Sequence, residues 1–481
     1  MTINYKIPSS FPDIKSFESY LKSIDASFGC DHNIMDSSGP MGKEFNIAGH
    51  TLKNRFAIHP MEGWDGNEDG LPSEHTFRRW YRFGLSASSL IWGGEAFSVV
   101  PEGRANPHQL HQGSSKRIGI GLKDLIRKIK SGREKIGLGN EEALIGLQLT
   151  HSGRWSHPNK TGPSPKIAFR HPILDWKSGV NSDEALISDN ELADLPKYYA
   201  EASELASKAG FSFVDIKCCH GYLLHELLAA RSRPGPYGGS FNNRTRLFRE
   251  IVSSVRDASP GLEIGVRLSA TDLYPFSSNK DGLGEPKGLS ENLPYNLGFG
   301  INKDNPLEPD YNETFDFLDL LCKMKIKLVN ITIGSPYYTP HIQRPAAFPP
   351  SDGYLPPKDP LESVLAHIAT VRLIKSSFPH LILVGSGYSY LQHWLPNIAQ
   401  YEVRNGHVDF VGLGRMVLSY PELPLDILNG NPIEKKKICR TFSDCTTGPR
   451  NGMASGCYPL DPYFRKRPEA DKIRSMRKAR I

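Results

Sequence analysis

The sequence predicts an α/β fold, a (β/α)8 TIM barrel, from three observations. Eight short runs are apolar over nearly their whole length, as strands are when both faces of a parallel sheet are covered. Helical patterns lie between several of these runs. The runs span residues 55–413, a length that suits a barrel with insertions. A doubly wound sheet divided between two domains is the alternative interpretation.

The predicted elements alternate along the chain in the order that a barrel requires. The eight predicted strands are Arg55–Pro60, Ser89–Gly93, Ala143–Leu149, Phe213–Lys217, Glu263–Leu268, Lys327–Thr332, Leu381–Gly385 and Asp409–Leu413. Helical periodicity precedes the fourth to seventh of them, over Ala193–Ala209, Arg244–Ala258, Asn312–Met324 and Pro360–Ser376.

Two long loops follow predicted strands, residues 151–186 after the third and 272–310 after the fifth. In a barrel such loops lie on the catalytic face, where they shape a pocket. We expect three parts in the chain: an N-terminal extension (1–50) that covers the barrel floor, a barrel (51–430), and a C-terminal cysteine loop with a basic tail (431–481).

Composition is that of a folded globular chain, with 38% hydrophobic and 23% charged residues among 481. No apolar run is long enough to cross a membrane, and no secretory leader is evident. The net charge of +6 lies in residues 465–481, so it indicates a tail and not a nucleic-acid-binding face. An odd cysteine count of seven favours a reducing compartment, and we expect a cytoplasmic protein.

Polar and glycine-rich motifs stand at the C-terminal ends of the predicted strands, where barrel enzymes carry their chemistry. The seventh strand ends in Gly385-Ser386-Gly387, and the eighth ends in Gly412-Leu413-Gly414-Arg415. Glycines expose backbone N–H groups, and Arg415 adds a permanent cation. Together, after strands seven and eight, the two motifs predict a phosphate site.

The ordered series of motifs resembles the Old Yellow Enzyme family of FMN-dependent oxidoreductases. The resemblance extends from Asn54 to Pro424 and more weakly to Pro462. It is strongest to the long members related to 2,4-dienoyl-CoA reductase and trimethylamine dehydrogenase. The motifs are NRFAIHPM, GGEAFSVVPEGR, QLTHSGR, HGYLLHELLAARSRPGPYGGSFNNRTRLFREIV, VRLSA, VGSG and GLGRMVLSYPELP.

The resemblance implies a set of FMN-binding residues. Pro60, Met61 and Glu62 are expected along the flavin, with Glu62 and Ala96 near its N5/O4 edge. Gln148 is expected at the pyrimidine side and Arg267 near N1/O2. A cation near N1/O2 stabilises the anionic reduced flavin. The full expected set is Pro60, Met61, Glu62, Ala96, Gln148, Arg267, Gly385, Ser386, Gly387, Gly414 and Arg415.

The expected catalytic residues are Lys217, His220, Tyr222 and Glu62, and two of them depart from the family. Relatives carry His-x-x-Asn or His-x-x-His after the fourth strand, whereas this chain has Lys217 in the first place. Lysine is a point charge and donates to carbonyl or carboxylate oxygens, which favours an anionic substrate. The alternative is that Lys217 pairs with Glu62, which itself replaces the usual Thr or Cys.

A third departure concerns iron. The long relatives hold a 4Fe–4S cluster on four cysteines after the barrel. Here Cys439, Cys445 and Cys457 fit three of the four positions, and Phe442 occupies the second. Two alternatives remain: a cluster completed by an open iron or by Asp444, or a lost cluster whose loop persists. No C-terminal nucleotide-binding domain is expected in this sequence, so either NAD(P)H meets FMN directly or electrons leave to a separate carrier.

The resemblance implies an FMN-dependent NAD(P)H oxidoreductase that reduces an activated, α,β-unsaturated substrate by hydride transfer from FMN N5. The alternative is a flavin-dependent amine dehydrogenase or demethylase that passes electrons to a partner. A third alternative is a flavin-binding protein without turnover. The expected partners are a small-molecule substrate, that electron-transfer partner and a second copy of the chain in a homo-oligomer. Neither nucleic acid nor a membrane span is expected.

Overall fold

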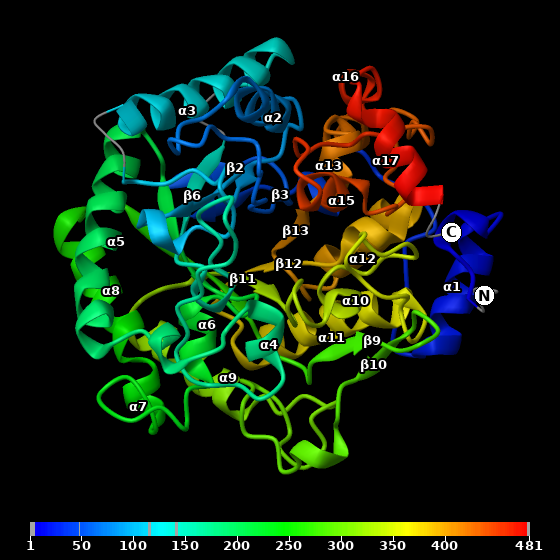
Figure 1. Cartoon of the computed structure of the whole chain (residues 1–481). Helices are drawn as coiled ribbons and strands as arrows, with labels where there is room; N and C mark the ends of the chain where they lie inside the picture. Colours follow the sequence, from blue (N-terminus) through cyan, green and yellow to red (C-terminus); the bar gives the residue numbers. More distant parts are fainter. Residues whose placement is uncertain (1–4, 48, 114–116, 140–142, 479–481) are drawn as a thin grey trace.

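The computed structural model describes residues 5–47, 49–113, 117–139 and 143–478, and its centre is a closed parallel barrel (Figure 1). The last strand pairs with the first, and β4 pairs directly with β6, which closes the ring. This arrangement confirms the predicted (β/α)8 fold. The barrel strands are β3 (Phe56–Ile58), β4 (Leu90–Ile91), β6 (Leu144–Thr150), β7 (Phe213–Cys218), β8 (Glu263–Ser269), β11 (Leu328–Thr332), β12 (Ile382–Gly385) and β13 (Phe410–Leu413).

Each predicted strand is present, and the second is the shortest. It is split because Gly94 adopts a positive φ of 51°, a conformation that glycine takes at little cost. The chain then resumes as β5 (Ala96–Ser98), which pairs with the upper half of β6. The break at Gly94 carries the chain from β4 to a second position beside β6.

Helices cover the outside of the barrel (Figure 1). The predicted helix at Ala193 begins earlier, at Asp189, because Ser188 and Glu191 form a capping box there. The covering helices are α2 (Glu74–Gly84), α3 (Arg117–Lys135), α5 (Asp189–Ala209), α8 (Arg246–Ala258), α9 (Asn312–Lys323), α11 (Pro360–Ser377) and α12 (Leu395–Arg404). Shorter elements are α4 (Leu174–Ser178), α6 (Leu223–Leu228), α7 (Phe241–Arg244), β9 (Phe276–Ser278), β10 (Gly284–Pro286), α10 (Pro340–Gln343), α13 (Arg415–Ser419) and α14 (Leu423–Leu428).

The barrel floor is filled by an antiparallel hairpin, β1 (Phe45–Ile47) and β2 (His50–Leu52). Leu52 is fully buried and joins a cluster with side chains that point into the barrel interior, Trp92 and Phe213 among them. The rest of the N-terminal extension lies elsewhere. Helix α1 (Ile14–Ile24) packs beside α12, where Phe17 stacks on Trp394. Within the described part of the N-terminal extension, the hairpin is therefore the element that covers the barrel floor. It continues past residue 50, where we expected the extension to end.

The C-terminal segment forms three helices, α15 (Asp444–Arg450), α16 (Pro462–Arg465) and α17 (Glu469–Lys478). They enclose a small core of their own that includes Phe464 and Ile473. The segment is tied to α2 by an ion pair of 2.8 Å between Arg78 and Asp461. Part of the basic tail is thus structural, because Arg477 forms a 2.8 Å ion pair with buried Asp444. No described helix is both long and apolar enough to span a membrane.

We predict that Leu52→Ala destabilises the protein by about 2–5 kcal/mol, because it leaves a cavity in the barrel floor. Thr51→Ala is the matched control, since Thr51 is exposed on the same strand, and its effect is expected to stay within about 0.5 kcal/mol. The free energy of unfolding, measured with urea, tests both. Equal effects for the two variants would contradict a floor built on this hairpin.

Candidate active site

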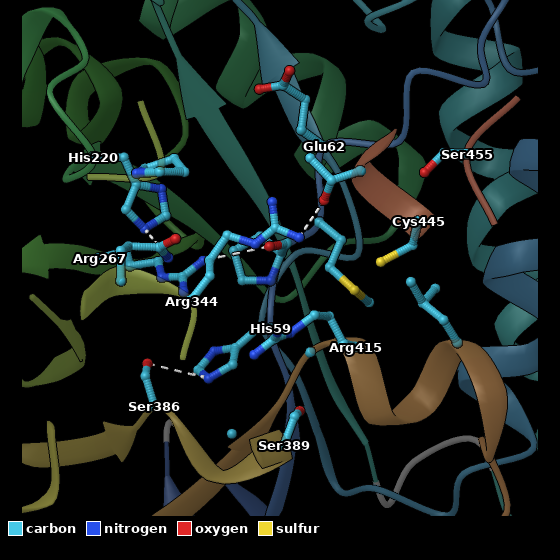
Figure 2. A pocket seen from close by; sticks show the side chains of 18 of the residues that line it. His59, Glu62, His220, Arg267, Arg344, Ser386, Ser389, Arg415, Cys445 and Ser455 are labelled. Carbon is cyan, nitrogen blue, oxygen red and sulfur yellow. Dashed lines mark hydrogen bonds between the residues drawn. The ribbon is translucent and has the colours of Figure 1, made fainter. Parts of the chain in front are cut away.

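A cavity of about 240 Å³ opens at the C-terminal ends of the barrel strands (Figure 2). Its wall combines residues that lie on or after seven barrel strands with residues of the C-terminal segment. The lining residues used below are His59, Pro60, Met61, Glu62, Trp64, Gln148, Lys217, His220, Tyr222, Arg267, Tyr337, Gln343, Arg344, Ser386, Gly387, Gly414, Arg415, Cys445, Thr446 and Arg450. Most of the residues expected from the sequence therefore meet at one place.

A buried carboxylate, Asp215 on β7, organises the lower wall of this cavity. Its oxygens accept hydrogen bonds from the Gln148 side chain (2.6 Å), the Trp92 indole (2.8 Å) and the Arg267 backbone N–H (2.7 Å). Burial raises the pKa of Asp215 to about 6, although these hydrogen bonds oppose the shift. Gln148 commits its amide nitrogen to Asp215, which leaves its amide oxygen for a ligand in the cavity.

Arg267 lies above Asp215 with its guanidinium in the cavity wall. Its Nη1 donates to the Pro60 carbonyl at 3.3 Å, whereas its Nε is buried without a hydrogen-bond partner among the described residues. An unmet donor on a buried cation costs free energy unless a ligand accepts from it. Arg267 is therefore poised for an acceptor group inside the cavity.

The glycine motifs after β12 and β13 form a second region of the wall, opposite the β7 end. Gly387 has φ 93°, which requires glycine, and no atom lies within 4 Å of the position that a Cβ on Gly414 would take. Ser386 donates to the Ile331 carbonyl (2.7 Å) and lies 3.2 Å from His59 Nε2, as Figure 2 shows. The backbone there is open toward the cavity.

Two arginines face this region and share the wall in Figure 2. Arg415 donates through Nη2 to the Pro345 carbonyl (2.7 Å), and its Nη1 is buried without a partner in the described parts of the chain. Arg344 donates to Thr446 Oγ1. Burial lowers the pKa of Arg344 to about 10, and the charges of Arg415 and Arg450 add to this effect. These two cations have no carboxylate at ion-pair distance among the described residues, which makes this region suited to a dianion.

Two expected cofactor residues lie behind the wall. Ala96 is 1% exposed, and its carbonyl accepts from Gln109 at 2.9 Å. Gly385 is covered by Tyr388, whose ring lies 3.2 Å from the position of a Cβ on this glycine. Neither residue is among those that line the cavity.

Lys217 is buried in the opposite wall with no carboxylate at ion-pair distance among the described residues. Its Nζ lies 3.7 Å from the centre of the Tyr222 ring, a cation–π contact. Burial lowers the pKa of Lys217. The pairing of Lys217 with Glu62, one of the two sequence-based alternatives, is not formed in this structure.

Glu62 is instead held by three neutral donors. Its Oε2 accepts from the Tyr222 hydroxyl at 2.5 Å, and its Oε1 accepts from the Trp64 indole (2.8 Å) and the Asn106 amide (3.0 Å). An ionised carboxylate is an acceptor only and suits such a set. His220 lies nearby with Nε2 3.0 Å from Gln343 Nε2. Burial lowers the pKa of His220 well below its ordinary range, so this imidazole is neutral at pH 7.

The three C-terminal cysteines lie close enough to affect one another. The pKa of Cys457 is raised first by burial and then by Cys439 and Cys445, and Cys445 also lines the cavity. Phe442, at the second of the four ligand positions of the long relatives, packs against Phe348 with a centroid distance of 5.3 Å. A 4Fe–4S cluster requires four ligands. The described cysteine loop supplies three thiols. Asp444, the candidate for a fourth ligand, forms an ion pair with Arg477.

Comparison with known proteins identifies the family. The model of the NADH:flavin oxidoreductase / NADH oxidase family matches residues 43–282. The chain is 31% identical over 274 residues to an NADPH dehydrogenase of Bacillus subtilis (strain 168), which covers 55% of this chain and 75% of that protein. It is 32% identical over 240 residues to the NADPH dehydrogenase of Geobacillus thermodenitrificans (strain NG80-2), with 63% of that protein covered. The chain therefore spans less than two thirds of the latter relative.

The chain thus belongs to the NADH:flavin oxidoreductase / NADH oxidase family, which confirms the resemblance to Old Yellow Enzymes. Experimental structures agree on the fold. An old yellow enzyme homologue from Zymomonas mobilis has a TM-score of 0.55 at 19% identity, over 82% of this chain and 94% of that one. A 2-naphthoyl-CoA reductase complex has a TM-score of 0.63 at 16% identity, over 90% and 58% of the two chains.

The cavity suits the FMN that this family implies. The unmet Nε of Arg267 and the free amide oxygen of Gln148 lie together and match the polar edge of a flavin ring. Arg415, Arg344 and the open glycine backbone match a phosphate dianion. Sequence reasoning found Arg415 from its glycine motif but missed Arg344, which stands in an irregular loop after β11.

We predict that Arg415→Ala reduces the FMN content of the purified protein to a small fraction, because a buried partner of the phosphate is lost. Arg344→Ala is expected to weaken FMN binding by about tenfold or more, the scale of a lost charge-assisted hydrogen bond. Flavin titration by fluorescence measures both dissociation constants. Arg404→Ala, on an exposed side chain far from the cavity, is the control. An Arg415→Ala protein that retains full flavin content would contradict the assignment.

Proposed function

We propose that the protein is an FMN-dependent NAD(P)H oxidoreductase that reduces an activated, α,β-unsaturated substrate. The observation that carries this proposal is Lys217. Its ammonium group lies in the cavity wall without a carboxylate partner and in contact with the Tyr222 ring. A cationic donor beside a tyrosine is suited to polarise a carbonyl and to protonate the adjacent carbon.

Residues of both wall regions would hold the cofactor: Gln148 and Arg267 the ring, and Ser386, Gly387, Gly414, Arg415 and Arg344 the phosphate. When bound, FMN supplies the transfer of hydride between NAD(P)H and the substrate. Met61 and Pro60 line the cavity beside Arg267, and their apolar atoms suit the face of a flavin ring. These roles rest on the family and on the hydrogen-bond donors in the cavity wall that have no acceptor among the described residues.

Lys217 would donate a hydrogen bond to the substrate carbonyl oxygen as negative charge develops there. Neutral His220, fixed beside Gln343, would position that oxygen without adding charge. Tyr222 would deliver the proton to the α-carbon. Because Lys217 and Arg344 both lack a carboxylate partner in the described wall, we also propose that the preferred substrate carries an anionic group, which would offset the uncompensated positive charge.

A second candidate function is supported by Glu62. Its carboxylate lies in the same cavity and accepts from Tyr222, an arrangement that would take a proton from a bound amine or methoxylated aromatic. This is the amine dehydrogenase or demethylase alternative, and it needs an electron-transfer partner.

We further propose a cytoplasmic location, because the seven cysteines form no disulfide. The electron-transfer partner and the homo-oligomer stay predictions.

Anaerobic mixing with NADH or NADPH tests the proposed function. We expect bleaching of the flavin absorbance by at least one of the two donors, followed by recolouring when an enone is added. Paired enones with and without a carboxylate test the anionic preference, and we expect the carboxylated member to have the higher kcat/KM. An amine that bleaches the flavin, where NAD(P)H does not, would overturn the proposal in favour of the second candidate.

We predict that Lys217→Met lowers kcat/KM for the enone by roughly 10²-fold, as loss of one oxyanion donor does. Bleaching by NAD(P)H is expected to stay within twofold. Burial lowers the pKa of Lys217, so the cation is lost as pH rises through a value below the ordinary lysine range. The wild type should lose activity over that alkaline interval, and Lys217→Met should not. Lys208→Met, at an exposed helix position, is the control.

A further inference from the structure

A second tyrosine extends the hydrogen-bonded chain that begins at Glu62. The Tyr337 hydroxyl lies 2.8 Å from the Tyr222 hydroxyl, which donates to Glu62 at 2.5 Å. Tyr337 belongs to the loop after β11, whereas Tyr222 follows β7 and Glu62 follows β3. Three separate barrel strands therefore contribute one continuous line of hydroxyl and carboxylate groups along the cavity wall.

The direction of this chain follows from the number of protons available. Tyr222 has one hydroxyl proton, and its hydroxyl uses that proton in the hydrogen bond that it donates to Glu62. The Tyr222 oxygen is therefore left to accept a hydrogen bond from Tyr337. The donor order is Tyr337 to Tyr222 to Glu62. Trp64 and Asn106, which donate to the other oxygen of Glu62, hold the carboxylate in place.

A ring contact and a backbone hydrogen bond hold Tyr337 in a defined position. Its ring is stacked on Trp155 with a centroid distance of 4.4 Å and an interplanar angle of 4°. Its backbone N–H donates to Ser335 Oγ at 3.2 Å, and Ser335 Oγ donates to the His220 carbonyl at 2.8 Å. This last bond fastens the loop after β11 to the loop that carries Tyr222.

We infer that Tyr337 is a positioning residue that aligns Tyr222 and returns a proton to it after each turnover. The inference rests on the proposed function. The substrate receives a hydride equivalent at its β-carbon, and NAD(P)H supplies that electron pair. The Tyr222 hydroxyl then turns from Glu62 to the substrate, and a C–H bond forms at the α-carbon as the Tyr222 O–H bond breaks. The Tyr222 oxygen takes the proton of Tyr337, and Tyr337 takes one from solvent, so one proton is consumed in each turnover.

Cations stand beside both tyrosines: Lys217 favours loss of the Tyr222 proton to the substrate, and Arg450 favours loss of the Tyr337 proton to Tyr222. Lys217 Nζ lies 3.7 Å from the centre of the Tyr222 ring, and the Arg450 guanidinium lies 5.5 Å from the centre of the Tyr337 ring. Burial raises the pKa of Tyr222 well above its ordinary value, and Glu62 raises it further. A tyrosinate at Tyr222 is therefore short-lived, and a donor at 2.8 Å restores its proton.

Tyr337→Phe tests the inference, because it removes the hydroxyl and keeps the ring that stacks on Trp155. We expect normal FMN content and normal bleaching by NAD(P)H, since that step needs no proton from Tyr222. Recolouring by the enone is expected to slow about tenfold, against roughly 10²-fold or more for Tyr222→Phe. The solvent deuterium isotope effect on recolouring should rise, and KM should change less than kcat.

Tyr338→Phe is the matched control at the next position. Its hydroxyl donates to Asp272 at 2.8 Å and has no bond to Tyr222, so its recolouring rate should stay within twofold of wild type. A Tyr337→Phe protein with wild-type recolouring and isotope effect would overturn the inference while the proposed function stands. A wild-type protein that NAD(P)H bleaches but no enone recolours would instead overturn the proposed function.

Discussion

The site depends on one buried carboxylate. Asp215 stands inside the barrel on β7, and its partners come from the strands on either side and from the break after β4: Gln148, Arg267 and Trp92. A buried carboxylate is costly unless its oxygens accept hydrogen bonds. Asp215 has three such bonds, and each fixes a neighbouring strand or its side chain. The orientation of Gln148 and the height of the Arg267 backbone above the floor both follow from it.

Charge is distributed unevenly around that centre. Away from the cavity, buried arginines are neutralised: Arg79 lies between Asp65 and Glu95, and Arg154 lies between Asp175 and Glu226. Around the cavity the described cations Lys217, Arg344 and Arg415 lack such partners. Broken or incomplete buried ion pairs are destabilising. A fold that satisfies its structural arginines and leaves the cavity cations unmatched is arranged to take up anionic ligands, of which a phosphate is one.

The sequence predicts the barrel well because strand burial and helix periodicity are local signals. The two glycine motifs of the phosphate site could be predicted for the same reason, since each is contiguous and follows a strand: Ser386–Gly387 and Gly414–Arg415. Arg344 and Tyr337 could not, because they lie in an irregular loop whose path depends on tertiary contacts. Asp215 looked like one polar residue within an apolar run. The partners of Glu62 come from three separate segments, so no spacing in the chain could distinguish its bonding to Tyr222 from a pair with Lys217.

The C-terminal segment is part of the cavity wall and not an appendage to it. Thr446 binds Arg344, Ser443 donates to the Phe348 carbonyl at 2.7 Å, and Arg450 pairs with Asp352. These bonds attach the cysteine loop to the loop after β11, which also carries Tyr337. Phe442 and Arg477 fill the space beside the cysteines by packing, with Arg477 4.7 Å from the centre of the Phe442 ring. A change in the redox or ligation state of Cys445 would therefore act directly on Arg344, which binds the adjacent Thr446.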